Sequence, residues 1–169
     1  KEEDNGIDDD NNGYVDDIRG WDFFTNDNNP MDETSSRNPG HGTHCAGTIG
    51  AAANDGNPHV GVTWKVQLMA CKIFKDNGGT GSFSSDVVES VDFAVSNGAK
   101  ILSNSWKLGA HSGAIYDSIV AARDAGVIFI AAAGNDGRNT DLDPVYPASY
   151  DLANIISVAA IDRYGNRAW

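Results

Sequence analysis

The sequence is short of the features that mark several classes of protein. It has no run of about 18 apolar residues, so no segment is predicted to span a membrane. Its two cysteines, Cys45 and Cys71, are too few for a disulfide framework. Positive charge is also scarce, because 12 Lys and Arg residues stand against 24 Asp and Glu residues. With no basic patch to neutralise phosphates, we expect neither a nucleic acid nor an anionic membrane as a partner.

Negative charge is concentrated at the beginning of the sequence. Residues 1–33 hold twelve acidic and two basic residues, a net charge of −10 out of −12 for the whole chain. The 169 residues, 40% of them hydrophobic, are enough for one globular domain with a core of its own. A local charge of this size requires a counter-charge.

Composition divides the chain near residue 40. Residues 1–40 are rich in Asp, Asn, Gly and Pro and show almost no apolar periodicity. We expect them to form an ordered loop segment anchored by Trp21, Phe23 and Phe24. Residues 41–169 alternate between helical and strand patterns, with expected helices at 42–53, 83–96 and 115–125 and expected strands at 66–74, 101–105, 127–133 and 155–161.

Strands separated by helices of this length predict an α/β fold with a parallel, doubly wound sheet and helices on both faces. The continuous apolar strand 127–133 fits burial on both sides. Sites in such sheets gather at the carboxyl ends of the strands. This rule places residues 104–106 and 134–135 at the functional edge.

Two histidines open the helix of small residues that begins His41-Gly42-Thr43-His44-Cys45. An imidazole at the start of such a helix stays accessible and can act as a general base near neutral pH. The alternative is that both histidines only cap and pack the helix.

A second motif follows the apolar strand 127–133. The Asn135 amide in Gly-Asn-Asp-Gly is placed to donate a hydrogen bond to a developing oxyanion. The alternative is a plain turn, because the same four residues are favourable turn residues.

In order along the chain, the segments HGTHCAGTIGA, GVTW, ILSNSW, VIFIAAAGNDG, YPASY and NIISVAAID resemble the catalytic domain of subtilisin-like serine proteases (subtilases). The resemblance implies a secreted serine endopeptidase that hydrolyses peptide bonds in peptide or protein substrates through an Asp-His-Ser triad. It implies that His41 is the general base, His44 a structural histidine and Asn135 the oxyanion donor. It further implies that the substrate is bound by Gly79, Gly81, Ser82, Ser105, Trp106, Ala132, Ala133 and Gly134.

The sequence departs from the family pattern at the other two triad positions. Neither the Asp-Thr/Ser-Gly turn of the catalytic aspartate nor the Gly-Thr-Ser-Met-Ala turn of the serine occurs in the 169 residues. We therefore expect a single partial catalytic domain, truncated at both ends and inactive alone, because loss of a triad serine lowers turnover by about 10⁶. One alternative is a catalytically inactive calcium-binding fragment that acts as a binding or regulatory module. Another is a fragment complemented by other fragments of the same protease, so that activity belongs to the complex, and a protein inhibitor is a further candidate partner.

A smaller departure is Lys107, which follows Trp106 where subtilases usually have glycine. Two expectations stay open here. The lysine either crowds the specificity pocket or favours acidic side chains in the substrate.

The acidic segment contains part of a calcium-binding pattern. Its spacing reproduces the first nine positions of an oxygen-rich calcium loop, with glycine at the sharp turn. Arg19 occupies the twelfth position, so the loop is not an EF-hand, and Asp17 is a candidate for the missing carboxylate. The candidate ligands are Asp8, Asp10, Asn12, Tyr14, Asp16 and Asp17. The alternative is a solvated acidic turn.

The resemblance implies a second calcium loop, known in the thermitase-like branch, with ligands Asp22, Asp27 and Asp32. Ca²⁺ is thus the expected counter-charge and cofactor. Cys45 matches the thiol-bearing subtilases, although a small buried apolar role explains it as well. A disulfide to Cys71 requires Cα atoms within about 7 Å of each other.

Overall fold

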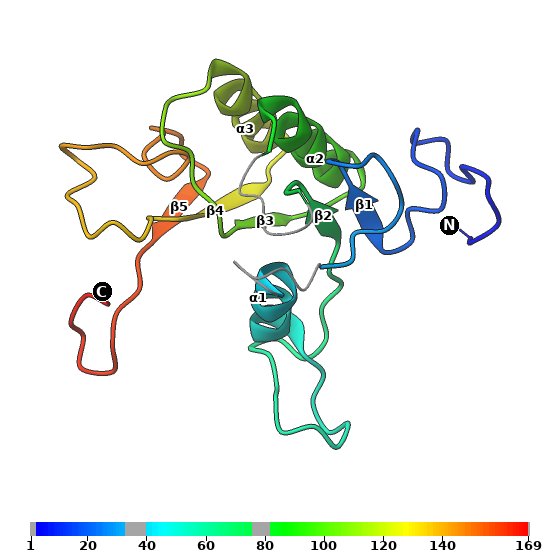
Figure 1. Ribbon diagram of the computed structural model, residues 1–169, viewed down its shortest axis with the longest axis horizontal. Coiled ribbons are helices and arrows are strands. Elements are labelled where there is room, and N and C mark those ends of the chain that lie inside the picture. Colours follow the sequence, from blue (N-terminus) through cyan, green and yellow to red (C-terminus); the bar gives the residue numbers. More distant parts are fainter. Residues whose placement is uncertain (1–2, 33–39, 76–81, 169) are drawn as a thin grey trace. The chain divides into compact units, whose positions relative to one another are not determined.

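The computed structural model describes residues 3–32, 40–75 and 82–168 (Figure 1). The chain divides into two compact units, residues 1–90 and residues 91–169. The division falls inside helix α2 (Ser84–Ser96) rather than at the change of composition near residue 40. None of the helices in the described residues is long and apolar enough to cross a membrane.

The first unit is built on two parallel strands, β1 (Gly20–Asp22) and β2 (Ala70–Lys72). Of the three aromatic residues expected to anchor the N-terminal segment, Trp21 and Phe23 are buried and Phe24 is only partly buried. The ring of Tyr14 packs edge-on against Trp21 and Phe23, with centroids 5.0 and 6.0 Å away. The sequence did not predict β1, because three residues are too few to show an alternating pattern.

Gly20 permits the close pairing of these strands. Its φ is +115°, and a Cβ placed there would lie 1.9 Å from the carbonyl oxygen of Ala70. Only glycine tolerates this combination of backbone angle and contact.

Helix α1 (His41–Gly50) follows in the same unit and contains no fully buried residue. The predicted helix ran to residue 53, whereas the observed helix ends at Gly50 because Ala51 is extended, with ψ 134°. A later segment is hydrogen-bonded to the C-terminal end of α1, since the Gly61 N–H donates to the Ala51 carbonyl at 2.9 Å.

The second unit contains a parallel sheet in the order β3 (Ile101–Asn104), β4 (Ile128–Ala132), β5 (Ile155–Val158). Helix α3 (Gly113–Asp124) connects β3 to β4 and packs on β4. Its N-cap is Ser112, whose hydroxyl accepts a hydrogen bond from the Ile115 N–H at 3.5 Å. The predicted combination of parallel strands and helices is confirmed.

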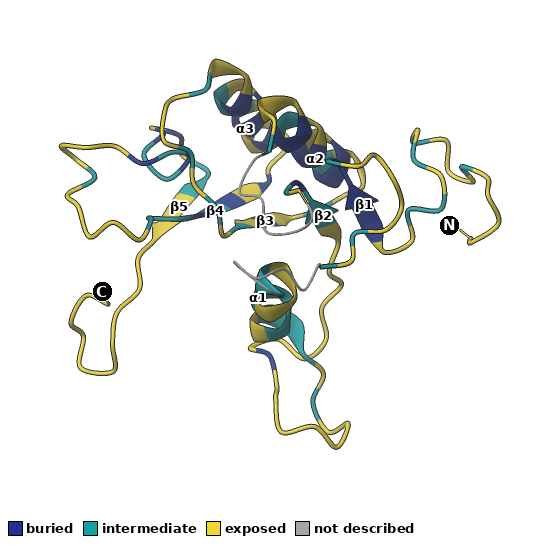
Figure 2. Cartoon of the chain, in the orientation of Figure 1, coloured by how far each residue is buried: buried dark blue, intermediate teal, exposed yellow. Residues whose placement is uncertain are grey.

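The core of this unit lies between α3 and the sheet, as the dark blue side of α3 shows in Figure 2. Ile115 and Ile119 of α3 and Phe129 of β4 are fully buried. Burial alternates along β4, and Ile128 is 41% exposed. The expectation that residues 127–133 are buried on both sides is therefore wrong for Ile128.

Two strands are shorter than their apolar runs. β2 covers 70–72 of the predicted 66–74, because its partner β1 has only three residues. β5 ends at Val158, opposite the last residue of β4, while Ile161 forms an isolated antiparallel bridge with Arg167. Strand length here is set by the partner and not by the length of the apolar run.

Candidate active site

His41 is the first residue of α1 and is partly buried. Cys45 lies one helical turn after His41. Its Sγ atom is 3.9 Å from the Nε2 atom of His41. Neither cysteine is in a disulfide, so Cys45 and Cys71 are not joined. The imidazole is thus held at a helix end with a thiol beside it.

The N-terminus of α1 receives its capping acceptor from a distant residue. Gly40 occupies the N-cap position and has no side chain to offer. The carboxylate of Asp32 accepts a hydrogen bond from the Thr43 N–H at 2.8 Å, in the first turn of the helix. A carboxylate at this place satisfies an otherwise free donor and favours the positive end of the helix dipole. Asp32 therefore positions the helix that carries His41.

Sequence reasoning assigned Asp32 only to a calcium loop and missed this contact. The glycine at the N-cap position is the signal that could have pointed to it, because it leaves the first-turn N–H groups open to an acceptor from another segment.

Asn135 lies in the second unit, just beyond the carboxyl end of β4, and is exposed. The preceding Gly134 has φ +96°, which turns the chain at this edge of the sheet. Ala133 still belongs to the sheet, because its N–H donates to the Val158 carbonyl at 2.9 Å. An exposed amide after a rigid strand can donate to an oxyanion formed on a bound substrate.

The expected substrate walls flank this edge. Ser105 and Trp106 follow β3, the strand next to β4. Two contacts hold the indole of Trp106 in place. Its Nε1–H donates to Asn104 Oδ1 at 3.1 Å, and its ring packs edge-on against Phe129. Ala132, Ala133 and Gly134 are partly buried at the end of β4. The structure thus brings the two predicted walls together on neighbouring strands.

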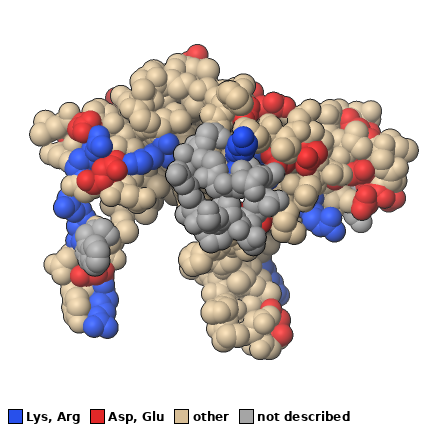
Figure 3. Space-filling model, in the orientation of Figure 1, with Lys and Arg blue, Asp and Glu red and all other residues tan. Residues whose placement is uncertain are grey.

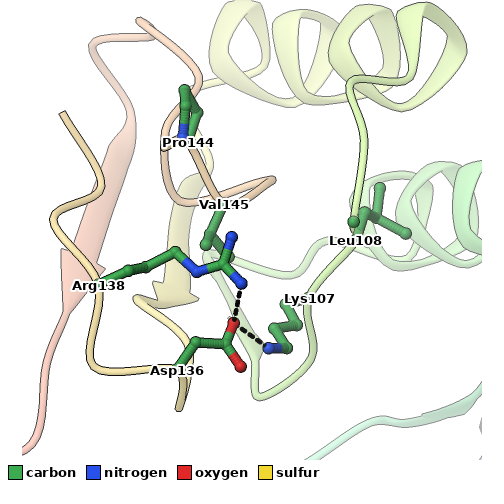
Figure 4. Close-up of a pocket in the computed structure, with 7 residues that line it drawn as sticks. Lys107, Leu108, Asp136, Arg138, Pro144 and Val145 are labelled. Atoms are coloured by element: carbon green, nitrogen blue, oxygen red, sulfur yellow. Dashed lines mark hydrogen bonds and ion pairs between the residues drawn. The ribbon is translucent and has the colours of Figure 1, made fainter. Parts of the chain in front are cut away.

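A cavity of about 220 Å³ opens beside these segments, within the second unit (Figure 4). It is lined by Lys107, Leu108, Gly109, Asp136, Arg138, Pro144 and Val145. The Leu108 N–H donates to the Tyr146 carbonyl at 2.6 Å, which ties two of the lining segments together.

Three charged side chains meet at this cavity. Lys107 Nζ lies 2.5 Å and Arg138 Nη2 lies 3.4 Å from Oδ2 of Asp136. The hydrogen bond from Lys107 and the two positive charges lower the pKa of the Asp136 carboxyl. Sequence analysis noted Lys107 but not the other two, because nothing in a turn sequence says which charges will converge.

The acidic loop of residues 3–17 forms many short-range hydrogen bonds (Figure 3 shows its acidic side chains at the right). The carboxylates of Asp8 and Asp10 converge on one donor, the Asn12 N–H, at 3.1 and 3.2 Å. Asp16 accepts from the Asn5 and Gly6 N–H groups. Within the described ranges, no group of three or more His, Cys, Asp or Glu side chains is arranged to hold a metal ion.

Asp22, the first ligand expected in the second calcium loop, is 1% exposed and engaged through both oxygens. Oδ2 accepts from Lys72 Nζ at 2.5 Å, while Oδ1 accepts from the Phe24 and Thr25 N–H groups. Asp27 Oδ1 accepts from the Asn29 N–H at 2.9 Å. The ammonium of Lys72 thus faces the buried carboxylate of Asp22.

The remaining predicted residues are distributed as follows. Gly79 and Gly81 lie outside the described residues, and Ser82 is partly buried just before α2. His41 belongs to the first unit and Asn135 to the second.

Comparisons with known proteins agree with the motifs. A model of the subtilase family matches residues 3–168. Thermitase from Thermoactinomyces vulgaris is 33% identical over 151 residues, covering 89% of this chain and 50% of thermitase. A thermophilic serine proteinase from Bacillus sp. (strain AK1) is also 33% identical over 151 residues, covering 89% of this chain and 35% of that proteinase.

A solved structure, a mutant of the protease domain of PatA, is similar with a TM-score of 0.64 and 25% identity, covering 76% of this chain and 45% of that one. The chain thus spans half or less of the length of these three proteins. The family match nevertheless extends over almost all of the 169 residues and includes the His41 and Asn135 motifs. The chain belongs to the subtilase family.

Proposed function

We propose that the protein is a serine endopeptidase in which this chain supplies the general base, His41, and the oxyanion donor, Asn135. The catalytic aspartate and serine come from parts of the protein outside the 169 residues. The observation that carries the proposal is the exposed Asn135, three residues beyond the end of the parallel strand β4 and next to Gly134, whose φ is positive.

Each residue has a defined task in this reaction. The His41 imidazole accepts the proton of the serine hydroxyl as the oxygen attacks the peptide carbonyl, and then donates it to the leaving amine. The Asn135 Nδ2–H donates to the carbonyl oxygen as it becomes negative. Residues 105–106 and 132–134 bind the substrate backbone on either side.

The test uses the full-length protein and its Asn135→Ala variant. We expect a fluorophosphonate probe to label one serine, and the variant to lose about 10²–10³-fold in kcat with little change in KM, because the amide acts mainly in the transition state. Arg123→Ala, an exposed position on α3, is the matched control and should retain activity. A full-length protein that is not labelled and cleaves no peptide would instead support the inactive binding module.

We also propose that the loop of residues 8–17 binds Ca²⁺. Its potential ligands are all oxygens, the kind that Ca²⁺ prefers, and Asp8 and Asp10 already converge on one point. Loops of this kind with modest affinity work where calcium is abundant, which fits a secreted protein. The proposal does not extend to Asp22, because Lys72 already neutralises that carboxylate.

A further inference from the structure

The cavity between residues 107–109 and 144–145 adjoins the two segments proposed to bind the substrate, residues 105–106 and 132–134. Lys107 comes after Trp106, and Asp136 comes after Asn135, so the cavity begins where both walls end. Gly134 borders it as well, because a Cβ there would lie 3.4 Å from Val145 Cγ1 and 3.7 Å from Lys107 Cδ. The cavity is therefore lined by the chain neighbours of Trp106 and of Asn135, the proposed oxyanion donor.

The lining of the cavity is apolar on one side and charged on the other. Leu108, Pro144 and the nearly buried Val145 form the apolar part of the lining. Lys107 and Arg138 point toward Asp136 on the charged side (Figure 4). A volume of about 220 Å³ accommodates a side chain of medium size.

The lining holds two cations, Lys107 and Arg138, and one carboxylate, Asp136, while a second carboxylate, Asp143, lies 2.5 Å from Arg138 Nη1. The two cations share one oxygen of Asp136. A lysine ammonium has three donors and a guanidinium five, so both cations retain donors for a further anion. The carboxylate of Asp136 is already engaged by both cations and offers little to a basic side chain.

We propose that Lys107 and Arg138 make this cavity selective for an acidic residue on the amino side of the scissile bond, and that they exclude lysine and arginine there. The proposal rests on the proposed endopeptidase function. Asp136 holds the two cations in place and limits how strongly they attract the substrate. The substrate class is therefore peptides with Glu or Asp at this position.

The first experiment measures kcat/KM of the full-length protein on peptides that differ only in this residue, as Glu, Gln or Lys. We expect Glu to exceed Gln by about tenfold and Gln to exceed Lys by a similar factor, because each partly exposed ion pair contributes up to about fivefold. The Glu-to-Gln ratio should fall with added salt, since Lys107 and Arg138 are 39% and 42% exposed. Equal rates for Glu and Gln would overturn the proposal.

Variants separate selectivity from general damage to the fold. Lys107→Met should lower the Glu-to-Gln ratio about threefold, and Asp136→Asn should raise it, because the cations lose their internal partner. Arg123→Met removes an exposed arginine of the same unit that pairs with Asp124, and it should leave the ratio unchanged. A uniform loss on all three peptides in both cavity variants would indicate a purely structural role and refute the proposal.

A binding measurement keeps this inference separate from the catalytic one. Calorimetry with the full-length His41→Ala variant compares acetylated tetrapeptides that end in Glu, Gln or Lys. Tighter binding of the Glu peptide supports the selectivity even where no cleavage is found, and equal affinities contradict it. Absence of cleavage of every peptide counts against the endopeptidase function alone.

Discussion

Cys71 lies in β2 and is partly buried. Burial raises the pKa of this thiol from 9.0 to about 12, so the native state keeps the proton when an unfolded chain would lose it. Its contribution to stability is complete below about pH 9 and is lost as the pH rises toward 12, because the unfolded state then binds fewer protons than the native one.

This gives a prediction for alkaline stability. Between pH 7.5 and pH 10, the wild-type free energy of unfolding should fall by about 1 kcal/mol more than that of Cys71→Ala. Urea unfolding of both proteins at the two pH values measures the difference. Parallel slopes for wild type and Cys71→Ala would contradict the assignment.

At the scale of elements, the pairing of β1 with β2 depends on one residue. A side chain at Gly20 meets the Ala70 carbonyl and would separate the two strands. We expect Gly20→Ala to lower the free energy of unfolding by roughly 3 kcal/mol, from the positive φ and the overlap together.

Gly6→Ala is the matched control for this change. Gly6 also has a positive φ, +78°, but no atom lies within 4 Å of the added Cβ. Its cost should therefore be about 1–2 kcal/mol, from the backbone angle alone. Urea unfolding of the two variants compares them, and equal losses would show that the approach of Ala70 is not limiting.

The elements also show what the sequence can and cannot predict. Apolar periodicity located α2, α3, β3 and β4 to within a few residues, because their own side chains form the core. β1 and the true length of β2 escaped prediction, since each depends on a partner about 50 residues away. The same holds for the site. The motif residues can be recognised in the sequence, but their contacts cannot, because Asp32 reaches α1 and Arg138 reaches Asp136 only in the folded chain.

At the scale of the whole molecule, the charge of −10 in residues 1–33 must be compensated. If the loop of residues 8–17 binds Ca²⁺, the ion stabilises the native protein by about 2.7 kcal/mol at a hundredfold excess over Kd. We expect excess EGTA to lower the Tm by several degrees.

Two variants locate the effect. Asp8→Asn should melt at one temperature with or without EGTA, because one converging carboxylate is lost. Asp124→Asn, an exposed acid on α3, should respond to EGTA as the wild type does. A wild-type Tm that is the same in calcium and in EGTA would refute calcium binding.

The buried pair of Asp22 and Lys72 has a consequence for how β1 finds its place. The two residues are direct neighbours in the parallel register. A slip of one residue would turn the side chain of Asp22 away from Lys72 and leave its carboxylate without the ammonium. Breaking a buried pair in this way costs about 3–5 kcal/mol. The pair therefore favours the observed register over shifted ones. The backbone hydrogen bonds of two strands of three residues would not provide this preference alone.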